Sequence, residues 1–198
     1  MTRGYSPNSH IAVVTGLPRS GTSLMMQMLA AGGMPVLADE RRPADAGNPR
    51  GYLEFEPVKR TRQDTSWIAE APGKAVKVVH ALLDALPTGP QYRVLFIRRD
   101  LDEVLASQAA LLGQLNRSGS AIPRERLAAA LAAQLSRARA WLEQQPNVRV
   151  LDIEHRALIL NPPDVAARVN QFLGGGLDEG RMSAVVDPAL YRHRSPGP

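Results

Sequence analysis

The chain contains no cysteine, and this absence excludes several kinds of chemistry at once. Disulfide bonds, iron–sulfur clusters, cysteine-bound zinc and thiol nucleophiles all depend on that side chain. A metal ion would need histidines and carboxylates as ligands, and the chain has only four histidines. We therefore expect no metal centre.

Long apolar runs are also absent, because no stretch approaches the length that crosses a bilayer. Residues 1–9 carry a single charge, at Arg3, and the apolar stretch Ile11–Val14 is too short for the core of a signal peptide. We expect a cytoplasmic protein with no membrane span. Its 198 residues, 44% of them hydrophobic and 22% charged, favour one globular domain over residues 1–198.

Lysine is scarce, although the chain is basic. Lys59, Lys74 and Lys77 are its only lysines, and arginines supply the rest of the 24 cationic residues, against 19 acidic ones. Arginine suits the forked recognition of phosphate-like groups, which favours an anionic partner, but an arginine-rich genome explains the same composition. The arginines are scattered and aromatic residues make up only 5% of the chain, which disfavours a nucleic-acid partner.

Short β-branched stretches alternate along the chain with segments of helical spacing. Because parallel strands need a crossover between them, the alternation predicts a three-layer α/β fold, with a central parallel sheet flanked by helices. Residues 34–56 are predicted to form an irregular loop region, and the polar segment Asn116–Ile122 a loop over the site. Strands are expected at His10–Thr15, Ala75–Val79, Tyr92–Ile97 and Val148–Ile153. Helices are expected at Thr22–Ala31, Pro57–Ala71, Leu101–Leu112, Arg124–Gln145 and Pro163–Leu173.

A glycine-bounded loop, Gly16–Ser23, joins the first predicted strand to the first predicted helix. Backbone N–H groups at a helix N-terminus bind anions such as phosphate, and here Arg19 adds a forked cation while serine and threonine hydroxyls add donors. The spacing is similar to the Walker A pattern, but Thr22 stands where that pattern requires lysine, which argues against an ATP-hydrolysing protein. The alternative is a glycine turn that merely links strand and helix.

The hexapeptide Pro18-Arg19-Ser20-Gly21-Thr22-Ser23 resembles the first loop, P-[KR]-S-G-T-[ST], of the sulfotransferases that use 3′-phosphoadenosine 5′-phosphosulfate (PAPS). The resemblance implies a P-loop NTPase-like fold and PAPS as cofactor, with 3′-phosphoadenosine 5′-phosphate (PAP) as its product. It also implies that these six residues bind the 5′-phosphosulfate. Arg19 stands where cytosolic members commonly have lysine.

A second match lies where the third predicted strand ends. Arg99 is followed by Glu103-Val104 and then by Ser107, a spacing similar to the 3′-phosphate motif of the same family. A cation at a strand end and a hydroxyl two turns into the next helix can converge on one anion at the carboxyl edge of the sheet. The resemblance therefore implies that Arg99 and Ser107 bind the 3′-phosphate. Taken alone, Arg98 and Arg99 would be a solvated strand end.

Weaker similarity extends over most of the chain from Ile11 to Gly174. Residues 48–54 look like the N-P-x-G-[YF]-x-E stretch of many bacterial members, and residues 148–174 look like their late strand and the helix that ends in F-L-G. A clear R-K-G-x-x-G segment, which wraps the 3′-phosphate and adenine in cytosolic members, is missing. Either cofactor affinity suffers, or Arg192 and Arg194 replace the segment.

Sulfuryl transfer needs cations at the transferring group and a base for the acceptor proton. Lys77 resembles the family lysine before the catalytic histidine and, with Arg19, is expected at the sulfuryl group; a plain strand-edge lysine is the alternative. His80 follows Lys77 by three positions where the family pattern has two, and a one-residue slip along a strand reverses the face. Glu54 matches the carboxylate of the bacterial stretch, so we favour it over His80 as the base. Its alternative role is an ion pair with an arginine such as Arg50.

The residues thus favour a PAPS-dependent sulfotransferase acting on a hydroxyl or amine of an unidentified small-molecule, carbohydrate or lipid acceptor. The alternative enzyme is a P-loop small-molecule kinase or other NTPase. Its support is Val148–Asp152, which resembles a Walker B strand whose aspartate would hold Mg²⁺ through water. A non-catalytic nucleotide-binding module is the third interpretation.

Overall fold

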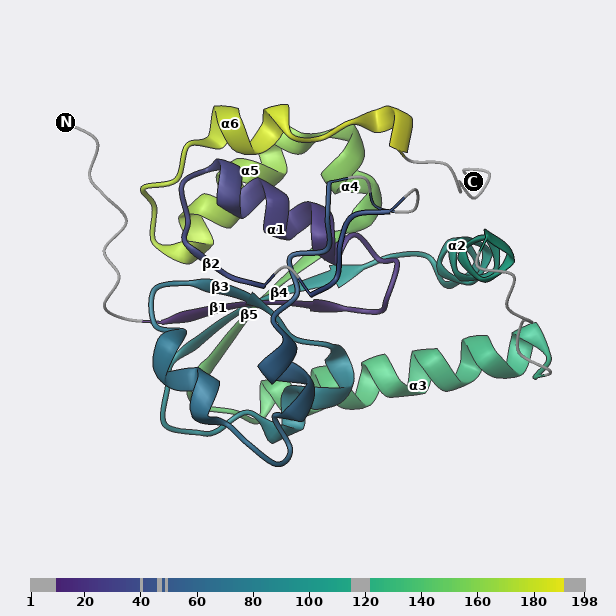
Figure 1. The fold of residues 1–198 in the computed structure, drawn as a ribbon, viewed down its shortest axis with the longest axis horizontal. Helices are drawn as coiled ribbons and strands as arrows, with labels where there is room; N and C mark the ends of the chain where they lie inside the picture. The colour runs from purple at the N-terminus through teal and green to yellow at the C-terminus, as the bar shows by residue number, and fades with distance from the viewer. Residues whose placement is uncertain (1–9, 40, 46–47, 49, 115–121, 191–198) are drawn as a thin grey trace.

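The fold is built on one all-parallel sheet of five strands (Figure 1). It comes from a computed structural model that describes residues 10–39, 41–45, 48, 50–114 and 122–190. The strand order is β2-β3-β1-β4-β5. The strands are β1 (Ile11–Gly16), β2 (Val36–Leu37), β3 (Ala75–Lys77), β4 (Tyr92–Arg98) and β5 (Val148–Glu154). The predicted α/β fold with a central parallel sheet is confirmed, and β2 is a short edge strand that the sequence did not predict.

Helices cover both faces of the sheet, which makes three layers (Figure 1). The upper layer in the figure holds α1 (Thr22–Ala31), α4 (His155–Leu160), α5 (Pro162–Leu173) and α6 (Glu179–Ala184). The lower layer holds α3 (Arg124–Glu143), which contacts β5 and the short helix η3 (His80–Ala85). The chain leaves β4 toward α2 (Leu101–Gln114), beyond the carboxyl ends of the strands. The remaining elements are the 3₁₀ helices η1 (Glu56–Arg60), η2 (Ser66–Glu70) and η4 (Pro188–Leu190).

The central strand β1 explains why the core has two halves. Every residue of β1 is buried, because helices cover the sheet on both sides. Ala12 and Val14 point into a cluster with α1 and α5, whereas Ile11 and Val13 point into a cluster with η2, η3 and α3. The loop that follows β1 therefore starts from a strand that is packed on both faces.

The prediction of one helix over Pro57–Ala71 is wrong. The segment forms two 3₁₀ helices, η1 and η2, separated by a turn. Side chains in the turn bind backbone groups: the Thr61 hydroxyl donates to the Val58 carbonyl at 2.5 Å, and an Asp64 oxygen accepts from the backbone N–H of Ser66 at 2.8 Å. Such local hydrogen bonds compete with helical ones and interrupt the helix.

Other element boundaries also depart from the prediction. The strand expected over Ala75–Val79 ends at Lys77, and η3 begins at His80. The helix after β4 begins as predicted, because the Asp100 carboxylate accepts a hydrogen bond from the backbone N–H of Glu103 at 3.1 Å. Of the predicted loop Asn116–Ile122, all but Ile122 lies outside the described residues. Among the residues that the structure describes, none of the helices is both long and apolar enough to cross a membrane.

Candidate active site

The loop after β1 turns tightly at the carboxyl edge of the sheet. Gly21 has a φ of 101°, and a Cβ atom there would lie 2.6 Å from Cδ2 of His155. A Cβ atom on Gly16 would lie 2.6 Å from the Ile97 carbonyl oxygen at the end of β4. Only glycine permits both close approaches. Arg19 also has a left-handed backbone, with a φ of 72°, so the loop between the two glycines is strained.

Arg99, directly after β4, and Ser107 on α2 contact the arginine of this loop. The Arg19 Nε donates to the Ser107 hydroxyl at 3.0 Å, and Nη1 of Arg99 donates to the Arg19 carbonyl at 2.8 Å. Arg99 also forms an ion pair with Glu103 at 2.9 Å, and both side chains are buried. The two segments that the sequence singled out separately therefore meet at Arg19.

Hydroxyl groups line the start of α1. The Ser20 hydroxyl is buried, with no hydrogen-bond partner among the described residues, and it lies 2.6 Å from where a Gly16 Cβ would stand. Thr22 and Ser23 line the adjoining cavity at the N-terminus of the helix. Ser20 is not among the described residues that line this cavity. The hydroxyls of Thr22 and Ser23, the helix-terminal N–H groups and nearby arginines form the donor set that a phosphate-like anion requires. The loop therefore fits such a group.

Lys77, the last residue of β3, reaches the same loop. Its ammonium donates to the Ser23 hydroxyl at 2.9 Å and also to the Tyr52 carbonyl. The side chain is buried, and this desolvation lowers the pKa of Lys77 to about 8, although the Glu54 carboxylate acts in the opposite direction. Lys77 thus places a cation of reduced basicity between the loop and residues 52–54.

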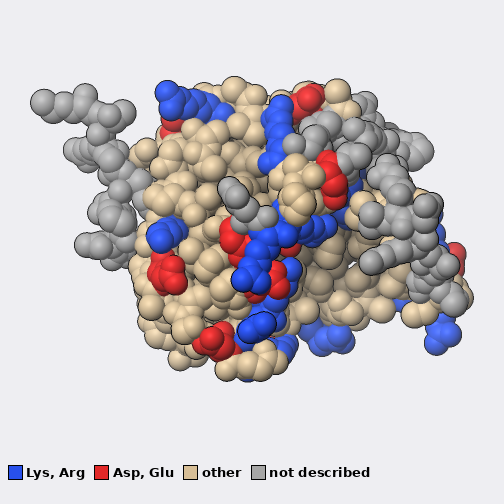
Figure 2. Space-filling model, viewed as in Figure 1, with Lys and Arg blue, Asp and Glu red and all other residues tan. Residues whose placement is uncertain are grey.

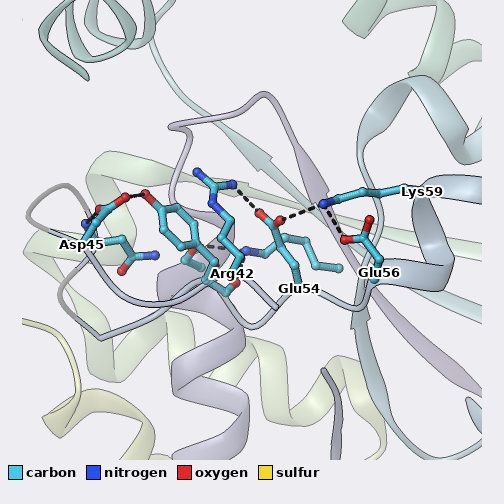
Figure 3. Close-up of polar contacts among 9 residues, drawn as sticks. Arg42, Asp45, Glu54, Glu56 and Lys59 are labelled. Carbon is cyan, nitrogen blue, oxygen red and sulfur yellow. Dashed lines mark hydrogen bonds and ion pairs between the residues drawn. The ribbon is translucent and has the colours of Figure 1, made fainter. Parts of the chain in front are cut away.

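Glu54 lies between two cations (Figure 3). Arg42 Nη1 contacts one carboxylate oxygen at 2.8 Å, and Lys59 Nζ lies 4.0 Å from the other. The Arg42 guanidinium also lies 3.4 Å from the centroid of the Tyr52 ring. The Tyr52 hydroxyl in turn donates to Asp45 at 2.8 Å. Glu54 is therefore held in one orientation by a stacked arginine that the sequence analysis missed.

The ion pair of Glu54 is thus with Arg42, and Arg50 donates to the Val185 carbonyl instead. Figure 2 shows basic side chains in a band over the middle of this face, with acidic side chains between them. Arg42 stands twelve residues before Glu54, in a region without periodicity. The sequence would have pointed to this ion pair only if every arginine near Glu54 had been considered as its partner.

His80 lies apart from these groups. It begins η3, it is buried, and its Nε2 contacts Oε1 of Gln134 on α3 at 3.0 Å. It is not among the described residues that line the cavity beside Glu54 and Lys77. The structure therefore brings Glu54 and Lys77 to one cavity and turns His80 toward α3.

A cavity of about 780 Å³ connects the loop, Lys77 and Glu54. Its volume is in the range of small-molecule sites. His155, which no sequence pattern singled out, lines the cavity and packs on Gly21. Burial lowers the pKa of His155 to about 4, and the Arg99 guanidinium acts in the same direction, so the ring is neutral at pH 7. The predicted site residues that line the cavity are Pro18, Arg19, Gly21, Thr22, Ser23, Glu54, Lys77, Arg99 and Ser107.

Two other charged residues, Asp152 and Arg98, are not among the described residues that line the cavity. Asp152, the Walker B candidate, accepts a hydrogen bond from Arg139 at 3.0 Å, and it is not among the described residues that line the cavity. Arg98 is exposed and pairs with Glu154 at 3.6 Å. Neither observation favours a kinase.

The profile of the sulfotransferase family matches residues 52–179. This range covers more than half of the chain, and the chain therefore belongs to the sulfotransferase family. The range begins after the first loop, at Tyr52. None of the curated proteins matches the sequence.

Solved structures of two sulfotransferases and of a retinol dehydratase share the fold. The sulfotransferase STF1 from Mycobacterium tuberculosis H37Rv aligns with a TM-score of 0.63 and 17% identity, over 89% of this chain and 70% of that one. The sulfotransferase domain from the curacin biosynthetic pathway aligns with a TM-score of 0.54 and 15% identity, over 98% of this chain and 94% of that one. A retinol dehydratase in complex with androsterone and the inactive cofactor PAP aligns with a TM-score of 0.53 and 15% identity, over 92% of this chain and 65% of that one.

Proposed function

We propose that this protein transfers the sulfuryl group of PAPS to a hydroxyl or amine of a small-molecule acceptor. The observation that carries the proposal is the meeting of two segments at Arg19: its guanidinium contacts Ser107 and its carbonyl contacts Arg99. The resemblance to PAPS-dependent sulfotransferases implies that the first loop binds the 5′-phosphosulfate. It also implies that Arg99 and Ser107 bind the 3′-phosphate. Their contact gives one molecule with both groups a continuous binding surface.

The donor set at this edge fits the anionic groups of PAPS. Arg19, Lys77 and Arg99 are cationic side chains that line the same cavity as the helix-terminal N–H groups of α1. PAPS, when bound, supplies the activated sulfuryl group. The cations of the chain stabilise negative charge on the oxygens at the reacting centre, and the buried position of Lys77 strengthens its interaction.

Glu54 is proposed as the group that takes the proton of the acceptor. It lines the cavity, is partly exposed to it, and carries two oxygens, one of which is held by Arg42 at 2.8 Å. Holding one oxygen orients the carboxylate for proton transfer at the other. His80 remains a less favoured base, because its Nε2 contacts Gln134 and its ring lies apart from the lining residues.

Ligand binding tests the proposal. PAP should raise the melting temperature, whereas ATP with Mg²⁺ should raise it much less, because a ligand stabilises the state it binds. Arg19→Ala should weaken PAP binding by about 1.5–3 kcal/mol, the value of a hydrogen bond to a charged group. Arg168→Ala is the matched control, since Arg168 is an exposed arginine that does not line the cavity.

The opposite results are equally informative. A preference for ATP with Mg²⁺ over PAP would support the kinase alternative and refute the proposal. Equal PAP affinity in the wild type and in Arg19→Ala would remove the loop from the binding site. PAP binding without transfer to any acceptor would favour the non-catalytic nucleotide-binding module.

A further inference from the structure

Tyr52 contacts the surroundings of both groups that are proposed to act in transfer. Its ring lies against Arg42, which pairs with Glu54 at 2.8 Å. Its backbone carbonyl accepts hydrogen bonds from the Lys77 ammonium and, at 3.5 Å, from the Ser23 hydroxyl. Tyr52 is only 5% exposed, and it lines the cavity. One buried residue therefore adjoins both the proposed base and the cation expected at the sulfuryl group.

The ion pair between Arg42 and Glu54 needs support from another group. The Arg42 side chain is 44% exposed, and one of its nitrogens meets one oxygen of Glu54 (Figure 3). Exposed pairs are weak, because water screens them and a long side chain loses freedom when it pairs. The Tyr52 ring supplies the support, since the guanidinium carbon of Arg42 lies 3.4 Å from the ring centroid, where the cation stacks on the ring. The ring thus restricts the arginine that restricts Glu54.

The Tyr52 ring is itself held in place. Its hydroxyl donates to the Asp45 carboxylate at 2.8 Å. Burial, together with this hydrogen bond, raises the pKa of Tyr52, so the hydroxyl keeps its proton and remains a donor. The Lys77 ammonium lies 6.0 Å from the centroid of the same ring. The ring is therefore a fixed surface for Arg42.

The backbone between Tyr52 and Glu54 is strained. Leu53 has a φ of 49°, a left-handed conformation that is uncommon for a bulky side chain. Such strain persists only where the surrounding contacts hold the chain. Here the Tyr52 carbonyl binds Lys77, and the Glu54 carbonyl accepts a hydrogen bond from the backbone N–H of Asp39 at 2.8 Å. The fold therefore sets where Tyr52 and Glu54 lie relative to each other.

Resting on the proposed function, we propose that Tyr52 is a positioning residue for the transfer, whose ring holds Arg42 against Glu54. It acts through Arg42 and not on the reacting atoms. A carboxylate with one oxygen held presents the other in a constant orientation for the acceptor proton, and a misplacement of about 1 Å can cost about 10² in rate. The ring, and not the hydroxyl, is the part of Tyr52 that the transfer requires.

Tyr52→Phe and Tyr52→Leu separate the ring from the hydroxyl. Release of PAP from PAPS is measured with phenol as the probe acceptor and, in parallel, with water alone. Tyr52→Leu should lower kcat at least about tenfold and change the KM for PAPS less than about twofold, because the ring acts on Glu54. Tyr52→Phe keeps the ring and should keep most of kcat. A loss in Tyr52→Phe as large as that in Tyr52→Leu would assign the effect to the hydroxyl and overturn the proposal.

Tyr92→Leu is the matched control for lost packing. Tyr92 is 2% exposed, its hydroxyl donates to the Pro87 carbonyl at 3.0 Å, and it is not among the described residues that line the cavity. Both leucine variants should lower the melting temperature, and the assays are run well below it. Only Tyr52→Leu should then lower kcat. Equal losses of kcat in the two variants would reduce the role of Tyr52 to packing and refute the proposal.

A double variant tests whether the ring acts through Arg42. Arg42→Met should lower kcat at least about tenfold, and adding Tyr52→Leu should cause no further loss, because the two changes remove the same support. If the two losses multiply, the ring acts independently of Arg42 and the proposal fails.

An NMR signal of Arg42 reports on the contact without turnover. The ring current of an aromatic side chain moves the resonances of protons above it upfield. The Nε–H resonance of Arg42, identified by its absence in Arg42→Met, should lie upfield in the wild type and in Tyr52→Phe, and return to its ordinary position in Tyr52→Leu. The same resonance in Tyr52→Leu and the wild type would contradict the proposal whatever the kinetics show. If PAP does not bind, or if PAPS releases no PAP with either probe, the proposed function fails, while this resonance still shows whether the ring holds Arg42.

Discussion

The ion pair between Arg99 and Glu103 provides a quantitative test of how the first loop is held. The two side chains are only 9% and 7% exposed, and they meet at 2.9 Å. Arg99 also donates to the carbonyl of Arg19. Arg99→Met would leave the Glu103 charge buried without this cation. Removing one partner of a buried pair costs about 3–5 kcal/mol, so we expect the free energy of unfolding to fall by that amount.

Arg124 supplies the matched control. It pairs with Asp102 at the same distance, 2.9 Å, but these side chains are 54% and 71% exposed. Solvent screens such a pair, and Arg124→Met should cost less than about 1 kcal/mol. The double variant Arg99→Met with Glu103→Leu removes both buried charges. It should regain part of the loss, and about 1–3 kcal/mol should remain because the donor to the Arg19 carbonyl is gone.

Urea unfolding followed by circular dichroism measures all of these variants. If Arg99→Met and Arg124→Met lower the free energy of unfolding equally, burial does not control the strength of these pairs and the reasoning fails. A double variant as unstable as Arg99→Met would show that the buried charge is not the source of the loss. An unchanged stability in Arg99→Met would show that the loop does not depend on this residue.

Three further predictions follow from the geometry. Gly21→Ala should destabilise the fold by more than about 1 kcal/mol, because the left-handed backbone of Gly21 and its close neighbour His155 both disfavour a Cβ atom. Gly113 in α2 has open space around it, so Gly113→Ala should not destabilise the fold. Thermal unfolding compares the two variants. Burial lowers the pKa of Lys77 to about 8 from 10.5, so the folded protein releases this proton before the unfolded chain does, and stability should rise from about pH 8 to 10.5. Lys77→Met should lack that rise in urea titrations at several pH values. Glu54→Gln should lower kcat by about 10²–10⁴ with little change in PAP affinity, whereas His80→Asn should lower kcat less. If transfer assays show the larger loss of kcat in His80→Asn, His80 and not Glu54 is the base.

Local patterns in the sequence predicted the parts of the fold that depend on local physics. The strand β1 is rich in β-branched residues and carries no charged side chain, as expected of a strand buried on both faces. The loop after it is recognisable from its glycines, since only they permit the close approaches at its two ends. The start of α2 follows from Asp100, whose carboxylate binds an N–H group three residues on. Each of these features arises within a few residues.

The prediction of one helix over Pro57–Ala71 was wrong because side-chain hydrogen bonds in this segment compete with the helical ones. The Trp67 indole N–H donates to the Thr61 hydroxyl at 3.1 Å, and both residues are buried. These bonds fix a turn in a segment whose helical propensity alone would have allowed one continuous helix. Burial, which depends on the rest of the chain, selected the turn.

The sequence alone predicted the alternation of most strands and helices, although not β2, α4 or α6, and it showed the resemblance to sulfotransferases. That the first loop binds an anion stays a prediction. Only the tertiary structure decided which side chains share the cavity. β3 ends at Lys77, so the two-residue alternation of a strand no longer applies at His80, whose ring contacts α3 instead. Arg42 reaches Glu54 and His155 reaches Gly21 because the chain folds back on itself, and no periodicity records such contacts. Alternation and glycine placement are local properties, whereas the meeting of distant residues depends on how the layers pack.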